Sequence, residues 1–215
     1  MDNVIEIKRL NYSVDGQDIL KNINLDIPRG TYLTFQGPSG SGKSTLMRII
    51  ASMITATSGE VLFNGQHLSS YEPTLYRQKV SYAFQQPTLF GKTVRENLEF
   101  PFLVRDKEFD QSLVTKYLEM VNLDESYIDK SVNDVSGGEK QRIALLRNLI
   151  FPPEVLITDE VTTGLDADNK AIVHDLIDRF NEKRGVTVLR VTHDESEIDA
   201  SSHTVTIESG EIKNV

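Results

Sequence analysis

The sequence predicts an α/β fold with a mixed sheet, built around one phosphate-binding loop. Three observations support this prediction. A glycine-rich loop stands between a short buried strand and an amphipathic helix, the first third of the 215 residues is rich in strand patterns, and residues 92–150 carry helical patterns. A chain of this length can bury a sizeable core in one large domain or two small lobes.

The glycine-rich loop reads Gly-Pro-Ser-Gly-Ser-Gly-Lys-Ser-Thr. We expect its strand at residues 31–36, and its helix follows with apolar residues at helical spacing from Leu46 to Met53. This is the pattern G-x-x-x-x-G-K-[ST] in the context that it requires, so we expect nucleotide binding. A chance match is expected in about one chain in a hundred of this length. The candidate phosphate-binding residues are Gly37, Pro38, Ser39, Gly40, Ser41, Gly42, Lys43, Ser44 and Thr45.

The chemistry of this loop follows from its backbone and from two side chains. Glycines let the chain wrap closely, so that backbone N–H groups point inward, and the following helix adds the positive end of its dipole. Lys43 can reach the β- and γ-phosphates, and the Ser44 hydroxyl can hold Mg²⁺.

Composition narrows the function further. The net charge is −9 without any run of Lys or Arg, so a nucleic acid is a poor candidate partner. The chain has no cysteine, which excludes a disulfide framework and a thiolate metal site. The first residues lack the pattern of a signal peptide and no apolar stretch approaches about 20 residues, so we expect neither a leader nor a membrane-spanning helix.

The first third of the chain alternates apolar and polar residues in short runs. These runs predict strands at residues 4–10, 23–27, 60–63 and 80–84. Asp15-Gly16 and Asn64-Gly65 are turn signals between such runs, and Pro87 ends the last of them.

The middle of the chain changes to helical spacing. Thr93-Val94-Arg95-Glu96 has the spacing of a capping box, and apolar residues at 113–121 form one face of a further helix. We therefore expect a helical lobe at about 92–150, ended by Pro152-Pro153 and inserted into the strand-rich part.

Ser136-Gly137-Gly138-Glu139 lies within this lobe and has two interpretations. Ser136 and Glu139 are again spaced as a capping box, so the segment can simply begin a helix. Two consecutive glycines weaken a helix and expose its N–H groups, which favours a second anion site. The residues alone leave these interpretations equally supported.

The last part of the chain returns to alternating strands and helices. We expect strands at 155–158, 186–191 and 204–207, a helix at 172–180, and a turn at Ser209-Gly210 into the tail. Asp159 and Glu160 follow the first of these strands, where carboxylates beside a phosphate loop can orient Mg²⁺ and an attacking water; the alternative is two acids that cap a strand. His193 also follows a strand, although a lone histidine is more often structural.

Five motifs now stand in a fixed order: the loop at 37–45, Gln85, residues 136–141, Asp159-Glu160 and His193. Together they resemble the ATP-binding subunit of an ABC transporter, over essentially the whole chain. The resemblance implies a P-loop NTPase fold of ABC type, with an N-terminal antiparallel β subdomain and an inserted helical subdomain. The single domain 1–215 would divide into a catalytic RecA-like part with its β lobe at about 1–91 and 151–215, and a helical lobe at about 92–150.

The resemblance also implies a role for each motif. The implied catalytic residues are Lys43, Gln85, Glu160 as general base and His193 as switch histidine, with Gln86 the alternative to Gln85. The implied metal ligands are Ser44, Gln85 and Asp159. The signature, which in this family contacts the γ-phosphate held by the other subunit, comprises Ser136, Gly137, Gly138, Glu139, Lys140 and Gln141. Gly164-Leu165-Asp166 lies where the D-loop follows the dimer seam.

Some positions depart from the family pattern. Val135 replaces the usual leucine before the signature, and Thr158 occupies a normally apolar position, where we expect its hydroxyl to bond locally. The position that usually stacks on adenine is Val14, with Tyr12 two residues earlier, so adenine packs on an aliphatic side chain or on Tyr12.

Finer detail resembles the YbbL/FetA subgroup, in which a small ATPase pairs with a separate membrane subunit and is associated with iron export. The segments that carry this resemblance are 76–82, 85–90, 99–102 and 138–142. The family resemblance implies a homodimer around two ATP and Mg²⁺, at the cytoplasmic face of the membrane, with a permease helix seated near Gln85 to Phe90.

Three other functions compete with this one. An ABC ATPase that drives a non-transport assembly scaffold would share every motif. A P-loop nucleotide kinase has no use for the signature or for His193, and a DNA-acting ABC ATPase requires basic surface that a net charge of −9 does not offer.

Overall fold

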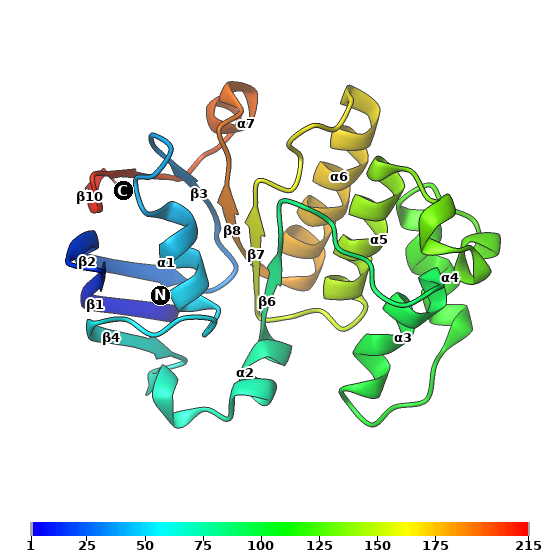
Figure 1. Cartoon of the computed structure of the whole chain (residues 1–215), viewed down its shortest axis with the longest axis horizontal. Helices are drawn as coiled ribbons and strands as arrows, with labels where there is room; N and C mark the ends of the chain where they lie inside the picture. Colours follow the sequence, from blue (N-terminus) through cyan, green and yellow to red (C-terminus); the bar gives the residue numbers. More distant parts are fainter. Residues whose placement is uncertain (1, 215) are drawn as a thin grey trace. The chain divides into compact units, whose positions relative to one another are not determined.

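The computed structural model describes residues 2–214 as two compact units (Figure 1). The first unit holds the described residues up to Tyr82, Glu154–Glu160 and those from Gly185 onward, and the second holds Ala83–Pro153 and Val161–Arg184. The predicted helical region, 92–150, falls within the second unit, which also contains residues 161–184. The division into catalytic and helical lobes at those boundaries stays a prediction.

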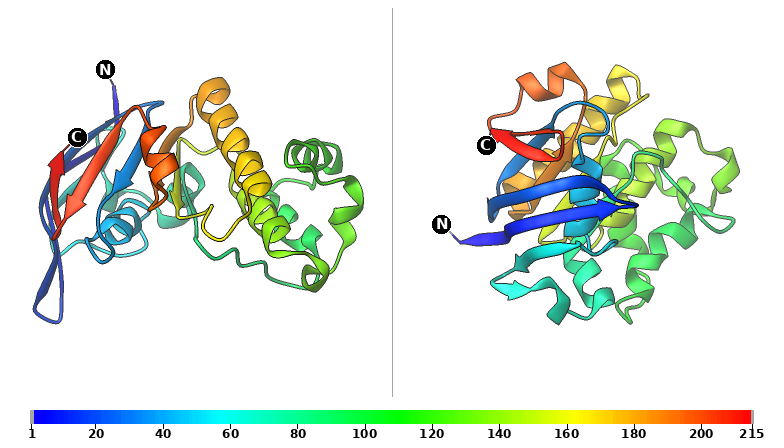
Figure 2. Two further views of the ribbon diagram at one scale, coloured as in Figure 1. Left: turned by 90° about the horizontal axis from the view of Figure 1, so that it is seen from above. Right: turned by 60° about the vertical axis from the view of Figure 1, so that its left-hand side comes forward.

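A four-stranded antiparallel sheet forms one layer of the first unit, in the order β2-β1-β4-β5. Its strands are β1 (Asn3–Val14), β2 (Gln17–Pro28), β4 (Ser58–Phe63) and β5 (Gln66–His67). The turn between β1 and β2 falls on the predicted dipeptide, because Asp15 and Gly16 both have positive φ, at 51° and 78°. The long β1–β2 hairpin is seen clearly in Figure 2. The expected N-terminal antiparallel β subdomain is therefore confirmed.

A six-stranded mixed sheet carries the functional residues, in the order β10-β9-β3-β8-β7-β6. Its strands are β3 (Tyr32–Gln36), β6 (Val80–Ala83), β7 (Val155–Asp159), β8 (Thr187–Val191), β9 (Thr204–Glu208) and β10 (Glu211–Asn214). Strands β9, β3, β8 and β7 pair in parallel, and β10 pairs antiparallel to β9. Phe35 pairs with Val191, and Val191 pairs with Asp159, so three strands end at one edge of the sheet. Ligands collect at this edge in α/β sheets.

The helices of the first unit are short. They are α1 (Lys43–Ile50), α2 (Pro73–Lys79), α7 (Glu195–Asp199) and the 3₁₀ helix η1 (Leu68–Ser70). Helix α1 buries Leu46, Met47 and Ile50 in the core and contacts β2 and β7. Burial of this apolar face fixes the first turn of α1 directly after the glycine-rich loop.

The second unit is helical. It contains α3 (Val94–Leu103), α4 (Gln111–Met120), α5 (Gly137–Leu149) and α6 (Ala167–Arg184), with the 3₁₀ helices η2 (Glu125–Asp129) and η3 (Val132–Asp134). Helix α5 packs against α3 and α4, and α5 and α6 lie side by side (Figure 1 and Figure 2).

Two details differ from the expectation. Helix α3 begins after Thr93 as predicted, but the capping box is wrong: the Thr93 side chain makes no cap bond, and Glu96 Oε2 accepts from the N–H of Lys92 at 2.8 Å. The tail after Gly210 forms β10, because it pairs with β9. Among the helices of residues 2–214, none has the length and apolar character of a bilayer-spanning segment.

Candidate nucleotide-binding site

The loop between β3 and α1 wraps so tightly that two of its glycines have no room for a side chain. Gly37 has a φ of 135°, and a Cβ there would collide with the carbonyl oxygen of Ile207. Gly42 has a φ of 106°, and its Cβ would lie 2.7 Å from the Leu20 side chain and 2.9 Å from the Ile19 carbonyl oxygen. Close backbone approach therefore explains both glycines.

The first turn of α1 is open to a ligand. Its N-cap residue is Gly42, which offers no side-chain cap, so the N–H groups that begin the helix have no side-chain acceptor from the cap. The Ser41 hydroxyl in the same loop is buried and has no hydrogen-bond partner among residues 2–214. Unpaired donors beside the positive end of a helix form an anion site, so the residues present fit a phosphate group.

Lys43 is buried within this loop. Its ammonium donates to the carbonyl oxygens of Gly37 at 2.8 Å and Pro38 at 3.0 Å. Burial lowers the pKa of Lys43, while the carboxylates of Glu160 and Asp159 act in the opposite direction. The ammonium therefore links the two ends of the loop by hydrogen bonds, and its positive charge can attract an anion.

Asp159, at the end of β7, joins α1 to β6. Its Oδ1 accepts from the Ser44 hydroxyl at 3.0 Å, and its Oδ2 accepts from the Tyr82 hydroxyl at 2.5 Å. Burial and this hydrogen bond raise the pKa of Tyr82, so its hydroxyl stays protonated and donates. A serine hydroxyl and a carboxylate side by side are hard oxygen ligands of the kind that suits Mg²⁺.

Glu160 and His193 meet at the ends of β7 and β8. Glu160 has a φ of 52°, an unusual conformation for a residue with a side chain, and its N–H donates to the Val191 carbonyl oxygen at 2.9 Å. His193 Nε2 lies 3.1 Å from Glu160 Oε1. The strained backbone holds the carboxylate toward the histidine, at the edge of the sheet where the glycine-rich loop begins after β3.

A cavity of about 290 Å³ lies over the loop. It is lined by Ile19, Ser39, Gly40, Ser41, Gly42, Lys43, Ser44, Thr45, Glu160 and His193. Tyr12 packs against the core, and Val14 is 44% exposed. The β1–β2 hairpin contributes Ile19 to the lining of this cavity. That adenine packs on Val14 or on Tyr12 stays a prediction.

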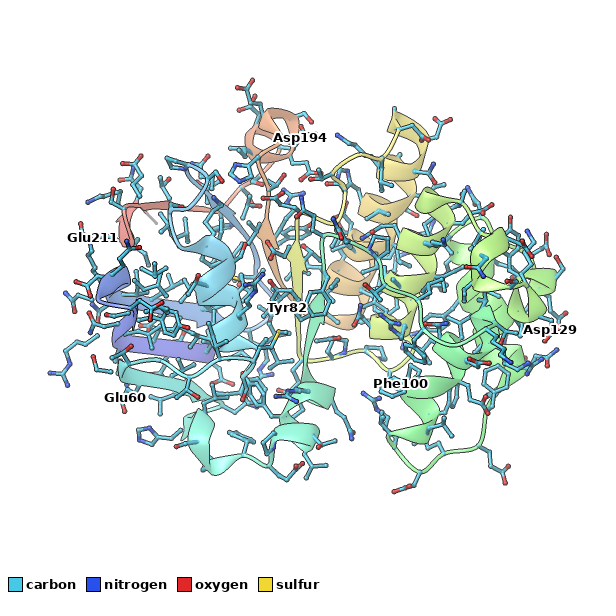
Figure 3. All side chains as sticks on the ribbon, in the orientation of Figure 1. Glu60, Tyr82, Phe100, Asp129, Asp194 and Glu211 are labelled. Atoms are coloured by element: carbon cyan, nitrogen blue, oxygen red, sulfur yellow. The ribbon has the colours of Figure 1, made fainter. Side chains whose placement is uncertain are left out.

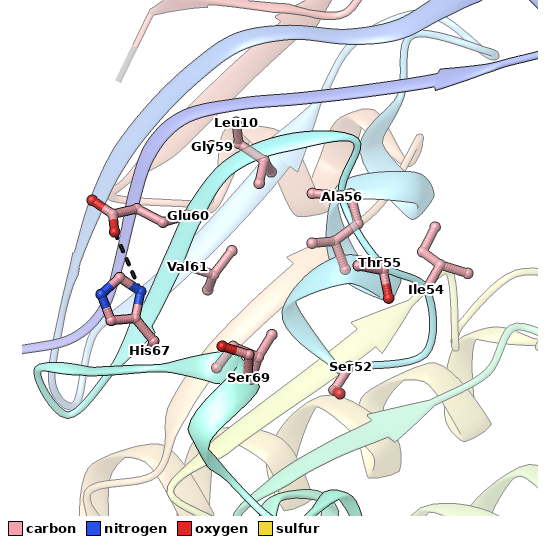
Figure 4. Close-up of a pocket in the computed structure, with 12 residues that line it drawn as sticks. Leu10, Ser52, Ile54, Thr55, Ala56, Gly59, Glu60, Val61, His67 and Ser69 are labelled. Carbon is pink, nitrogen blue, oxygen red and sulfur yellow. Dashed lines mark ion pairs between the residues drawn. The ribbon is translucent and has the colours of Figure 1, made fainter.

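A second cavity, of about 230 Å³, lies elsewhere in the first unit (Figure 4). Its wall includes Leu10, Val61 and the ion pair between His67 Nδ1 and Glu60 Oε2, at 3.3 Å. None of the predicted site residues lines it.

The signature begins helix α5 in the second unit. The Ser136 hydroxyl accepts from the N–H of Glu139 at 3.3 Å and Glu139 Oε2 accepts from the N–H of Ser136 at 2.7 Å, so the predicted capping box is confirmed. The Tyr127 hydroxyl donates to Glu139 Oε1 at 2.6 Å and is the main cause that lowers the pKa of Glu139. Ser136 and Gly137 are exposed while Gln141 is buried, so the capped tip of the helix is exposed.

Gln85 and Gln86 are exposed at the start of the second unit. The segment that follows them is held by Asn97, whose side chain donates to the Phe90 carbonyl oxygen at 2.8 Å and accepts from the Phe90 N–H at 3.0 Å. Arg147, near the end of α5, donates to Asn97 Oδ1 at 3.0 Å and to the Thr88 carbonyl oxygen at 3.1 Å. This segment is therefore fixed to α5.

Sequence reasoning missed several of these partners. Tyr82, Tyr127 and Asn97 bond to predicted site residues or their neighbours, yet nothing in their local sequence marks them. The expected local bond of Thr158 is wrong, because its buried hydroxyl has no hydrogen-bond partner in the described part of the chain.

Comparisons with known proteins show which family and which fold this chain is similar to. The family model described as ABC transporter matches residues 20–163. The probable iron export ATP-binding protein FetA of Escherichia coli (strain K12) is 43% identical over 95% of this chain and 91% of that protein. The spermidine/putrescine import ATP-binding protein PotA of Clostridium novyi (strain NT) is 35% identical over 100% of this chain, which spans 62% of that protein. The dimeric post-hydrolysis structure of the ATP-binding cassette MJ0796, bound to ADP and Pi, has a TM-score of 0.87 at 29% identity and covers 98% of this chain and 97% of its own.

The family match covers the loop, the signature and the Asp159-Glu160 pair, and the fold matches that of a cassette solved with ADP and Pi. The chain therefore belongs to the ABC transporter family, as an ATP-binding subunit whose ATP hydrolysis is coupled to transport.

Proposed function

We propose that two copies of this chain enclose two ATP molecules with Mg²⁺ and drive a separate membrane permease. Each ATP would lie between the loop at 37–45 of one copy and the signature of the other. The observation that carries this proposal is the exposed, doubly capped tip of α5 at Ser136 and Gly137. The solved MJ0796 cassette is a dimer with ADP and Pi, which supports the same arrangement here.

The residues around Asp159 fit a magnesium ion. Ser44 and Asp159 would hold it, the latter through water, and Gln85 is the third proposed ligand. Bound Mg²⁺ neutralises charge on the triphosphate.

The proposed hydrolytic roles follow from the contacts in the first unit. Glu160 would accept a proton from the attacking water as the bond from the γ-phosphorus to the ADP oxygen breaks. His193, 3.1 Å from Glu160, would orient that carboxylate and the γ-phosphate. Lys43 would leave the carbonyl oxygens of Gly37 and Pro38 for the phosphates. Positioning and charge stabilisation supply most of the rate in such reactions.

The proposed permease surface lies on the second unit. Phe90 and Phe100 are 42% and 44% exposed, their rings meet edge to face at 5.4 Å, and Leu103 is 60% exposed. Exposed apolar clusters of this kind mark interaction sites. A permease helix seated near Gln85 to Phe90 would cover them and would hold the chain at the cytoplasmic face of the membrane.

Iron export is the proposed transport activity. The support is the 43% identity to FetA, whose name gives iron export as probable, against 35% to a polyamine importer. An assembly scaffold in place of a permease is the alternative.

The central test replaces the proposed base. Glu160→Gln keeps the shape of the side chain but cannot accept the proton, so hydrolysis should fall at least about 100-fold. With ATP and Mg²⁺ the variant should accumulate as a dimer, measured by size-exclusion chromatography with light scattering. Wild-type protein with ADP is the control and should remain monomeric.

Two results would contradict the proposal. A Glu160→Gln variant that turns over ATP at the wild-type rate rejects Glu160 as base. A variant that hydrolyses slowly yet stays monomeric with ATP rejects the enclosed dimer.

A further inference from the structure

The carboxylate of Asp159 is held by two hydroxyls from opposite sides. Ser44, on α1, donates to Oδ1 at 3.0 Å, and Tyr82, on β6, donates to Oδ2 at 2.5 Å. Asp159 is 8% exposed, so little water competes for its oxygens. Two fixed donors leave the carboxylate one orientation.

The two donors differ in what a bound metal does to them. The Ser44 hydroxyl is itself a proposed metal ligand, so its bond to Asp159 would be lost when Ser44 turned to the metal. Tyr82 has no such second task, and its ring is anchored on β6 at the edge of the mixed sheet (Figure 3). With a metal bound, Tyr82 would therefore be the hydroxyl that still holds Asp159.

We propose that Tyr82 is a positioning residue for the metal site: its hydroxyl fixes the Asp159 carboxylate and so raises the contribution of Mg²⁺ to nucleotide affinity. This inference rests on the proposed metal site at Ser44 and Asp159. Groups that orient a metal-binding side chain typically change metal affinity or activity by about 10–100-fold when removed. Tyr82 touches Asp159 and acts through it.

The test measures binding without turnover. The dissociation constant of a fluorescent, non-hydrolysable ATP analogue is measured in EDTA and in saturating Mg²⁺. The constant in EDTA divided by the constant in Mg²⁺ is the ratio that gives the contribution of the metal to affinity. For Tyr82→Phe we expect the constant in EDTA to stay within about twofold of wild type and the ratio to fall about 10-fold.

Tyr76→Phe is the matched control. Tyr76 is fully buried in the same unit, and its hydroxyl donates to the Ile50 carbonyl oxygen at 2.6 Å, away from the metal site. Removal of this hydroxyl should lower the unfolding temperature but leave the ratio unchanged. The unfolding temperature of each variant, measured without nucleotide, confirms that it is folded.

The outcomes separate this inference from the proposed metal site. Asp159→Asn should abolish the effect of Mg²⁺; with that result, an unchanged ratio in Tyr82→Phe overturns the positioning role and leaves the site standing. Retention of the full Mg²⁺ effect in Asp159→Asn, or a ratio near one in the wild type, overturns both. A lower ratio in Tyr76→Phe as well would show a general loss of packing, and that also overturns the inference.

Discussion

The neighbouring glycines Gly137 and Gly138 should respond to alanine in opposite directions. A Cβ on Gly137 would meet no atom of the described residues within 4 Å. A Cβ on Gly138 would lie 2.9 Å from the Cγ, Nδ2 and Oδ1 atoms of Asn169. Neither glycine has a positive φ, so alanine fits both backbones and only the space around them differs.

The magnitudes follow from this difference. Alanine gains up to about 1 kcal/mol over glycine in a helix, and at position 137 nothing opposes that gain. At position 138 the carboxamide of Asn169 must turn away and lose its 2.8 Å bond to Asp166 Oδ2, which costs about 0.5–1.5 kcal/mol. Residual overlap adds about 1 kcal/mol. We expect Gly137→Ala to be about 2 kcal/mol more stable than Gly138→Ala, or about 4–8 °C in unfolding temperature.

Denaturant unfolding of the nucleotide-free chain, followed by circular dichroism, measures both variants. Asn169→Ala supplies the decisive background, because it removes the obstacle. There, Gly138→Ala should stabilise the protein as Gly137→Ala does in the wild type, giving a coupling free energy of about 2 kcal/mol. Equal stabilities of the two alanine variants in the wild-type background, or no coupling to Asn169, would refute the packing argument.

Two further predictions concern the second unit. Phe100→Ser should leave the ATPase rate of the isolated subunit within about twofold but reduce its stimulation by the permease in lipid about 10-fold, because the exposed ring would be a main contact. Leu75→Ser, on the other unit, is the control. Equal losses of stimulation in both variants would reject the proposed permease surface. The second prediction concerns Glu139, whose pKa is lowered chiefly by the Tyr127 hydroxyl. The Glu139 carboxylate therefore stabilises the folded state at pH values above its unfolded pKa near 4.5, and this stabilisation is lost as the pH falls through the lower folded pKa. The stability gap between wild type and Glu139→Gln in denaturant should thus be constant above about pH 5.5 and narrow below pH 4.5; a gap that does not change with pH would contradict this.

The features that the sequence predicted well are local ones. A few consecutive residues are enough to predict each of them: the loop at 37–45, the Ser136 capping box and the strand before Asp159. The order of the strands then brings Asp159 and His193 to the end of β3, because parallel strands share one carboxyl edge.

The features that escaped prediction join distant segments. Tyr82 and Asp159 are 77 residues apart, and Asn97 and Arg147 are 50 apart. Such pairs depend on which strands and helices become neighbours, and no periodic pattern encodes that choice. Thr93 shows that a local pattern can also mislead. The spacing of a capping box is present, but the Glu96 carboxylate accepts a hydrogen bond from the N–H of Lys92 and not from that of Thr93.

The bonds of Arg147 also have a mechanical meaning. They attach the segment before α3 to the last turns of α5, and α5 is a 13-residue helix of about 20 Å. We therefore expect a displacement of Thr88 to move Ser136 at the other end of the helix, because α5 would move as one body.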